Sequence, residues 1–176
     1  LYSQNFTTST DTYNTAVGRL ALAANTTAND NTAVGKSALT TNTTGDANVA
    51  VGTSALLLTT TGTRNTSIGT ESMYLNTTGS DNVAVGRDAL KSNTTGGANI
   101  AIGKDANYSN STSSHNLAIG YRTRVNGTTG SENVCVGNEA GEDMSTGEKN
   151  TLIGMYAGQH ITTNGSNVCI GYKAGS

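Results

Sequence analysis

The segment NVAVGRDALKSNTTGGA at residues 82–98 decides the fold, because close variants of it fill nearly the whole chain. Its opening pattern, Asn-x-x-(Val/Ile)-Gly, recurs ten times at a constant interval of 17 residues. The ten starts are Asn14, Asn31, Asn48, Asn65, Asn82, Asn99, Asn116, Asn133, Asn150 and Asn167. We call this Asn position 1 of each repeat. A fixed period without insertions is typical of a repeat architecture and not of an independently packed globular core.

A repeat of 17 residues is too short for two helices, and regularly spaced Gly would weaken one long helix by up to ~1 kcal/mol per Gly. Two short strands, at positions 2–4 and 8–10, fit better, with turns at the Gly of position 5 and at Asn-Thr-Thr-Gly. Strands of stacked repeats lie about 4.8 Å apart. The sequence therefore predicts an all-β, parallel β-solenoid of 17-residue coils over residues 14–176, with 1–13 as a partial N-terminal coil.

Stacking gives each repeated residue type a structural role. The Asn side chains of position 1 can form an amide ladder. Gly at position 5 is expected to adopt a positive φ at a corner. Thr at position 14, present in all nine complete repeats, suits a β-stack in which hydroxyl groups are chained. Structure alone accounts for these three columns.

The predicted core is thin. We expect position 4 (Val or Ile) and position 9 to point inward, and the small residues of position 3 to face another backbone. Position 9 is apolar in the first repeats, as Leu22, Leu39, Leu56, Met73 and Leu90, and then changes to Asn107, Arg124, Gly141, Gly158 and Gly175. Apolar residues appear instead at position 12, as Met144 and Ile161. We interpret this as a change of cross-section near residues 104–127. Because each coil buries so little, we expect association with copies of the same chain.

Composition excludes several classes of function. Only 12% of residues are charged and the net charge is −2, so no basic surface is available for nucleic acid. The longest apolar run, at residues 55–58, is far shorter than the ~20 residues of a membrane span, so we expect no membrane insertion. Pro is absent, as expected where backbone N–H groups are needed as donors. The chain begins at Leu1 without a signal peptide, and we expect it to be an excerpt of a longer protein.

No pattern predicts catalysis or metal binding. His115 and His160 lack partners at metal-ligand spacing, and Asp143, one coil below His160, favours an exposed salt bridge. We therefore predict a protein that is not an enzyme, with no catalytic, cofactor-binding or metal-binding residues and no cofactor. Positions 6 and 7 carry most of the charge, and stacked alternating charges are expected where consecutive coils place Asp105, Arg122 and Glu139 at position 7. This stripe is either a receptor-facing surface or a solvated face with weak ion pairs.

The two cysteines test the stacking. Cys135 and Cys169 both occupy position 3, two coils apart, so their Cα atoms should be almost 10 Å apart. A disulfide needs less than about 7 Å, so we predict no bridge within the chain. They are either buried free thiols or thiols clustered on a three-fold axis. Several Asn lie in Asn-x-Ser/Thr sequons, including Asn25, Asn42, Asn76 and Asn93 at position 12, and are either turn residues or glycan acceptors.

The motif Asn-x-Ala-Val-Gly-x-x-Ala-Leu-x-x-Asn-Thr-Thr-Gly and the later Ile-Gly-Tyr-Lys-Ala-Gly form resemble the repeats of two related groups. One is the head domain of trimeric autotransporter adhesins of the YadA type, and the other, which is more similar, is phage tail fibre proteins. The resemblance covers residues 14–176. It implies a left-handed β-roll, three identical chains and a place on a virion or cell surface. Adhesin heads usually have a shorter repeat, which favours the fibre.

We therefore predict a structural and adhesive fibre segment. It would form the homotrimeric shaft or head of a phage tail fibre that takes part in attachment to a glycan or protein on the host surface. The alternative is the head of a bacterial trimeric surface adhesin, so the predicted location is extracellular in both cases. An ice-binding solenoid is a third alternative. It is disfavoured because the adjacent Thr of positions 13 and 14 would point to opposite faces of a strand.

Overall fold

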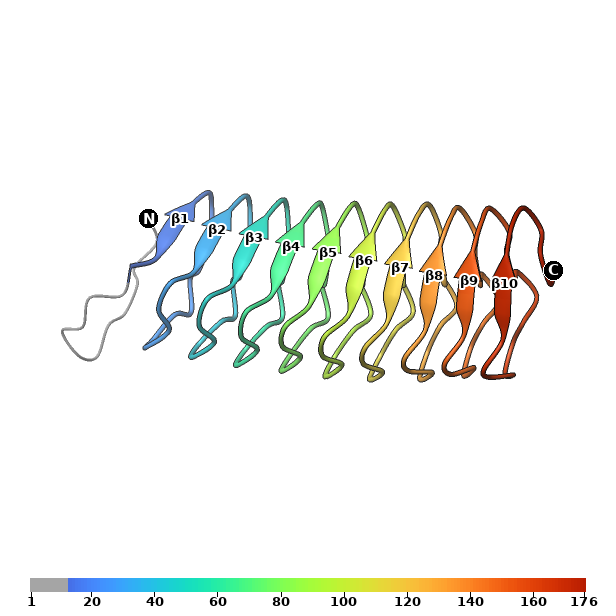
Figure 1. Ribbon diagram of the computed structural model, residues 1–176. Helices are drawn as coiled ribbons and strands as arrows, with labels where there is room; N and C mark the ends of the chain where they lie inside the picture. The colour runs from blue at the N-terminus through green and yellow to red at the C-terminus, as the bar shows by residue number, and fades with distance from the viewer. Residues whose placement is uncertain (1–12) are drawn as a thin grey trace.

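The computed structural model describes residues 13–176 as one continuous parallel β-solenoid, with one short strand in each repeat and no helix (Figure 1). The strands stack in sequence order into a single ten-stranded sheet. They are β1 (Thr15–Val17), β2 (Thr32–Val34), β3 (Val49–Val51), β4 (Thr66–Ile68), β5 (Val83–Val85), β6 (Ile100–Ile102), β7 (Leu117–Ile119), β8 (Val134–Val136), β9 (Thr151–Ile153) and β10 (Val168–Ile170). The all-β solenoid with 17-residue coils is confirmed, and the partial coil predicted at 1–13 lies, apart from Tyr13, outside the described residues.

Each position lies on the same position of the next coil, as the constant period predicts. Ala84 of β5, for example, pairs with Ala101 of β6. The glycine of position 5 adopts φ between 123° and 141°, so the predicted positive φ is confirmed. A Cβ there would lie within 2.3–2.6 Å of the carbonyl oxygen of the next glycine in every coil that has a following one. Gly is therefore required by both conformation and space.

The second strand predicted at positions 8–10 does not form. Those residues make turns, although their N–H groups still bond to the next coil, as from Leu90 to the carbonyl of Ala106 at 3.0 Å. The reason is the backbone of positions 7 and 9, which lies in the left-handed region, with φ of 59° at Asp88 and 51° at Leu90. Two left-handed residues within three positions bend the chain too sharply for a strand.

The sheet faces the opposite way from the prediction. The residues of position 3, small in every coil but the ninth, point inward and are fully buried in coils two to nine, whereas positions 2 and 4 point outward. Ile68 and Ile102, both at position 4, remain 40% and 38% exposed. The inward place opposite position 3 is taken by the large residue of position 9, such as Leu90. So narrow a coil holds only one large side chain at this level.

The core stays filled along the rod because the large and the small residue of each coil change places between positions 3 and 9. The first coils pair Ala or Ser at position 3 with Leu or Met at position 9, as in Ala84 and Leu90. Near the C-terminus the order is reversed, with Leu152 at position 3 and Gly158 at position 9. A Cβ on Gly158 would lie 2.7 Å from Cδ2 of Leu152, so the glycine makes room for the leucine. The core thus forms two apolar clusters, with Arg124 between them in the sequence.

Candidate interaction surface

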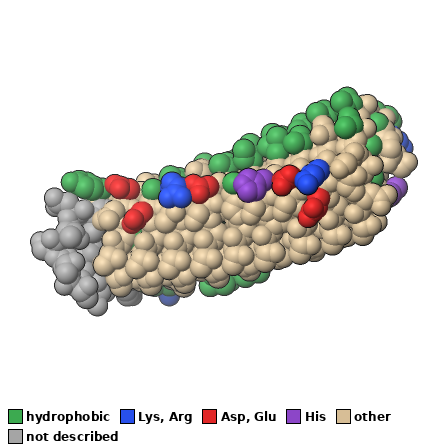
Figure 2. Space-filling model, turned by 60° about the horizontal axis from the view of Figure 1, so that its bottom comes forward, with side chains coloured by type: hydrophobic (Ala, Val, Ile, Leu, Met, Phe, Trp, Pro, Cys, Tyr) green, Lys and Arg blue, Asp and Glu red, His purple; other side chains and the backbone are tan. Residues whose placement is uncertain are grey.

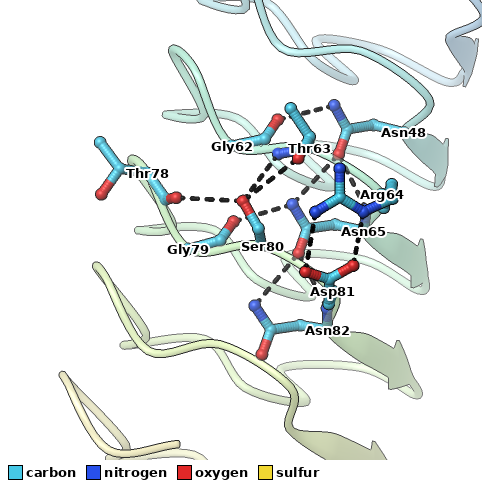
Figure 3. Close-up of polar contacts among 10 residues, drawn as sticks. All are labelled: Asn48, Gly62, Thr63, Arg64, Asn65, Thr78, Gly79, Ser80, Asp81 and Asn82. Atoms are coloured by element: carbon cyan, nitrogen blue, oxygen red, sulfur yellow. Dashed lines mark hydrogen bonds and ion pairs between the residues drawn. The ribbon is translucent and has the colours of Figure 1, made fainter.

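The Asn residues of position 1 form the predicted amide ladder along the rod (Figure 3). The side-chain oxygen of Asn48 accepts bonds from the backbone N–H of Asn65 at 3.0 Å and from its Nδ2 at 3.1 Å. The same Nδ2 donates to the carbonyl of Gly79 at 2.9 Å. Asn82 repeats this arrangement on Asn65. Each amide therefore joins two coils and also fixes the turn that precedes the next strand.

A second ladder occupies position 12, where the predicted sequons lie. Asn93 donates from Nδ2 to the side-chain oxygen of Asn76 at 2.8 Å and to the carbonyl of Gly96 at 3.0 Å. The sequon residues named above are at most 1% exposed, at Asn25, Asn42, Asn76 and Asn93. They are inward-pointing structural residues, so the folded coil gives a glycan-transferring enzyme no access to them.

Arg124 replaces one rung of this second ladder and was not singled out by sequence reasoning. Its guanidinium is fully buried and donates to the side-chain oxygen of Asn107 and to the carbonyl of Gly130, both at 2.5 Å. Position 12 of this coil is Gly127, whose Cβ would lie 2.5 Å from the guanidinium carbon. Burial lowers the pKa of Arg124 to about 10, and its Nε has no hydrogen-bond partner among the described residues. In the sequence, this buried arginine is indicated by Arg at position 9 together with Gly at position 12 of the same coil, where Asn is usual.

Both cysteines are free, as predicted. Cys135 is buried inside the coil, and burial raises the pKa of its thiol to about 12, against a smaller opposing effect of Arg124. Because position 3 faces the core of its own chain, the alternative of thiols gathered on a three-fold axis is wrong. Of the three positions of each strand, only positions 2 and 4 point away from this core.

The corner formed by positions 6, 7 and 10 carries most of the ion pairs. Lys91 contacts Glu71 at 2.6 Å and Asp88 at 2.9 Å, and lies 5.6 Å from the centre of the Tyr108 ring. The hydrogen bond to Glu71, followed by that to Asp88, raises the pKa of Lys91. These pairs join position 7 to position 10 of the next coil or of the same one, because both positions lie on one side of the corner.

Asp105, Arg122 and Glu139 stack on consecutive coils as predicted, but they form no ion pair with one another. Arg122 pairs instead with Glu142, at position 10 of the next coil, at 2.6 Å, and Asp105 pairs with the neighbouring Lys104 at 3.3 Å. The charged groups of this corner are therefore largely satisfied within the chain. Ion pairs of this partly exposed kind contribute about 0–1 kcal/mol each.

On the Thr-rich face, the hydroxyl groups that bond from coil to coil are not the predicted ones of position 14. The hydroxyls of position 13 donate to the carbonyl of position 13 in the next coil, as from Thr77 to Thr94 at 3.0 Å. Position 14 is exposed and lies in a turn. The argument that adjacent Thr residues would point to opposite faces of a strand is therefore wrong. Because the position 13 hydroxyls are already bonded, however, the face presents one free Thr column and not two.

The outward face of the sheet is an apolar stripe that runs the length of the rod. It consists of positions 2 and 4 of ten adjacent strands, and we call it the strand face. Position 4 is Val or Ile in every strand, and position 2 is Thr, Val, Ile or Leu. Its most exposed members are Val17, Ile68, Ile100, Ile102, Ile153, Val168 and Ile170. Figure 2 shows hydrophobic side chains along one edge of the view, next to a row of charged side chains and a broad face without charge.

No cavity or cleft is found in residues 13–176, nor any group of three or more His, Cys, Asp and Glu side chains that could hold a metal ion. Nδ1 of His160 lies 2.9 Å from a carboxylate oxygen of Asp143 on the surface, which confirms the predicted pair. Within the same residues no helix is long and apolar enough to cross a membrane. Comparison with family models, curated proteins and solved structures finds no significant match.

Proposed function

We propose that this chain is a segment of an extracellular structural and adhesive fibre, which assembles as a homotrimer through its strand face. The observation that carries the proposal is the stripe of positions 2 and 4, in which position 4 is Val or Ile in all ten strands. A stripe of this kind is typical of a surface that is covered in the assembled state, since monomeric proteins rarely expose large contiguous apolar patches. Fully burying one Val or Ile contributes about 1.5–3 kcal/mol, and the contribution is repeated in every coil.

The shape of the molecule supports a mechanical role. The solenoid is a rod in which every coil contacts its neighbours through backbone bonds and side-chain ladders. Three such rods packed around an axis would give a stiff shaft or head in the form of a left-handed β-roll. We propose a phage tail fibre that contributes to attachment to a glycan or protein on the host surface. The alternative is the head of a bacterial trimeric surface adhesin.

The assembly can be tested with one variant and one matched control. Size-exclusion chromatography with light scattering should give three times the chain mass of 17.9 kDa. Replacing two position 4 residues, in V85K/I102K, places charges in the strand face and should yield a folded monomer. The control T95K adds a charge on the Thr-rich face and should remain a trimer. A wild-type protein that stays folded as a monomer at micromolar concentration would contradict the assembly.

Attachment is tested separately. A fluorescently labelled trimer would be incubated with a panel of bacterial cells and, in parallel, with animal cells and extracellular matrix. Saturable binding to particular bacteria, lost with the V85K/I102K variant, supports the tail fibre. Binding to animal cells or matrix alone favours the adhesin. A trimer that binds neither would refute the adhesive part of the proposal and leave a structural shaft.

A further inference from the structure

The aromatic side chains of the rod are gathered on one corner. Between residues 14 and 176, Phe and Trp are absent and every Tyr occupies position 6, 7 or 10. The five are Tyr74, Tyr108, Tyr121, Tyr156 and Tyr172, and we call this row the aromatic corner. In each coil these positions follow the strand face, from which the glycine of position 5 separates them. The aromatic corner is therefore a different surface from the one proposed for assembly.

The fold does not require these rings. None of them belongs to either apolar core cluster, and Tyr121 and Tyr172 are 40% and 68% exposed. Tyr121 is joined to the next coil through its backbone N–H, which donates to Oδ1 of Asn138 at 3.1 Å without involving the ring. Other coils hold Thr or Asn at the same position, as at Thr70 and Asn138. Exposed tyrosines confined to one corner indicate recognition, because Tyr offers a large contact area at a low cost in side-chain entropy.

The charged groups beside the rings are already paired within the chain. Lys104 lies 5.3 Å from the centre of the Tyr121 ring and contacts Asp105 at 3.3 Å. Arg122, next to Tyr121 in the chain, contacts Glu142 at 2.6 Å. A charged partner would have to break these pairs, whereas an uncharged partner with many hydroxyl groups can use the donors and acceptors that remain. The aromatic corner therefore favours a neutral, hydroxyl-rich ligand.

A saccharide has this chemistry. The C–H face of a sugar packs on an aromatic ring, and its hydroxyl groups bond to amides, carboxylates and ammonium groups such as those around Tyr121. A protein partner would need a broader apolar area, which positions 2 and 4 provide and the corner does not. Because no cavity or cleft is found in residues 13–176, the ligand must lie along the surface.

The spacing of the rings along the rod suits a chain of sugars better than a single sugar. Coils stack at about 4.8 Å, so Tyr108 and Tyr121 differ in height by one coil, and Tyr74 and Tyr108 by two coils or about 10 Å. One sugar unit of an extended chain is similar in length to the height of one coil. A polysaccharide that lies along the corner therefore meets several rings in turn, and its weak contacts add up.

From these observations we propose that the aromatic corner binds an uncharged polysaccharide extended along the rod, with Tyr108 and Tyr121 in contact with neighbouring sugars. The proposal rests on the proposed function and deepens it, because it names the class of host receptor and the surface that contacts it. Long polymers should bind more tightly than short fragments of the same polymer, since only they reach several rings.

The experiment measures binding of the labelled protein to a microarray of purified neutral polysaccharides from bacterial surfaces, printed as long polymers and as short fragments. Y108A/Y121A removes two rings and should weaken binding to the recognised polymer by about tenfold or more. Y108F/Y121F keeps the rings and should retain most of the binding. The matched control T112A/T129A changes exposed residues of the same two coils on the Thr-rich face and should bind as the unchanged protein does. Circular dichroism and light scattering check that each variant is folded and assembled.

The outcomes separate this proposal from the proposed function on which it rests. A loss in Y108A/Y121A that T112A/T129A does not share supports the aromatic corner. Equal binding by Y108A/Y121A and the unchanged protein, an equal loss in T112A/T129A, or tighter binding of short fragments overturns it. A protein that binds bacterial cells but no polysaccharide also overturns it, while attachment through a protein receptor stands. A trimer that binds neither refutes this proposal together with the adhesive part of the proposed function.

Discussion

The exchange of core volume between positions 3 and 9 yields the sharpest prediction about stability. Leu152 is fully buried and faces Gly158 across the coil, where upstream coils have Ala facing Leu. Leu152→Ala alone leaves a cavity and should lower the free energy of unfolding by about 2–5 kcal/mol. Gly158→Leu alone overfills the same space, since even its Cβ would lie 2.7 Å from Leu152, and should cost about 1–3 kcal/mol or more.

The double variant L152A/G158L should be far more stable than the sum of the single variants implies. It rebuilds the upstream pair, and φ is +57° at Gly158 and +51° at Leu90, so the backbone already accepts a leucine there. We expect a residual loss of about 1–3 kcal/mol, from the left-handed conformation of a residue that is no longer Gly and from Ile161, whose Cδ1 lies 3.0 Å from the place of the new Cβ. The coupling free energy between the two sites should therefore be about 3 kcal/mol in favour of the pair.

The assay is urea unfolding followed by far-ultraviolet circular dichroism, with all variants at one protein concentration because assembly contributes to stability. The control is L152A combined with Leu56→Ala in a distant coil, where the losses should add. A double variant L152A/G158L that loses at least the sum of the single losses would refute the volume exchange. It would show that the two halves of the core are packed by different rules.

Three further predictions concern the interior. R124L/G127N, which restores the usual residue types at positions 9 and 12, should raise the free energy of unfolding by about 1–4 kcal/mol, measured by thermal unfolding, because it removes a buried cation; a lower melting temperature would contradict this. Burial raises the pKa of Cys135 from 9.0 to about 12, so stability present below pH 9 is lost as the pH rises, by about 1 kcal/mol between pH 9 and 10. In urea titrations at pH 9 and pH 10, Cys135→Ala should not show this loss. Neither pH exceeds the pKa of Arg124, which is about 10. An equal loss in Cys135→Ala and in the unchanged protein would rule out the thiol as its source. Gly86→Ala should destabilise the coil strongly, because φ is +132° and the new Cβ would lie 2.6 Å from the carbonyl oxygen of Gly103; hydrogen exchange that is unchanged in β5 and β6 would argue against it.

The sequence by itself determined the period, the parallel register, the Asn ladder and the role of Gly at position 5. The physical reason is that identical coils stack, so that spacing along the chain becomes distance along the rod. Asn48, Asn65 and Asn82 had to lie on one another once their spacing of 17 residues was known. The free state of Cys135 and Cys169 followed from the same spacing.

Only the tertiary structure decided which side of each strand faces inward. The alternation in Val83-Ala84-Val85 defines a bulky face and a small face but gives no preference for either as the interior. That choice depends on the opposite wall of the coil, where Leu90 takes the space and leaves room only for Ala84. The left-handed backbone of positions 7 and 9, which prevents a second strand, has no signal in residues such as Asp88 and Leu90. Because packing across the coil joins residues that are adjacent only after folding, the outward strand face, and with it the candidate interaction surface, had to come from the structure.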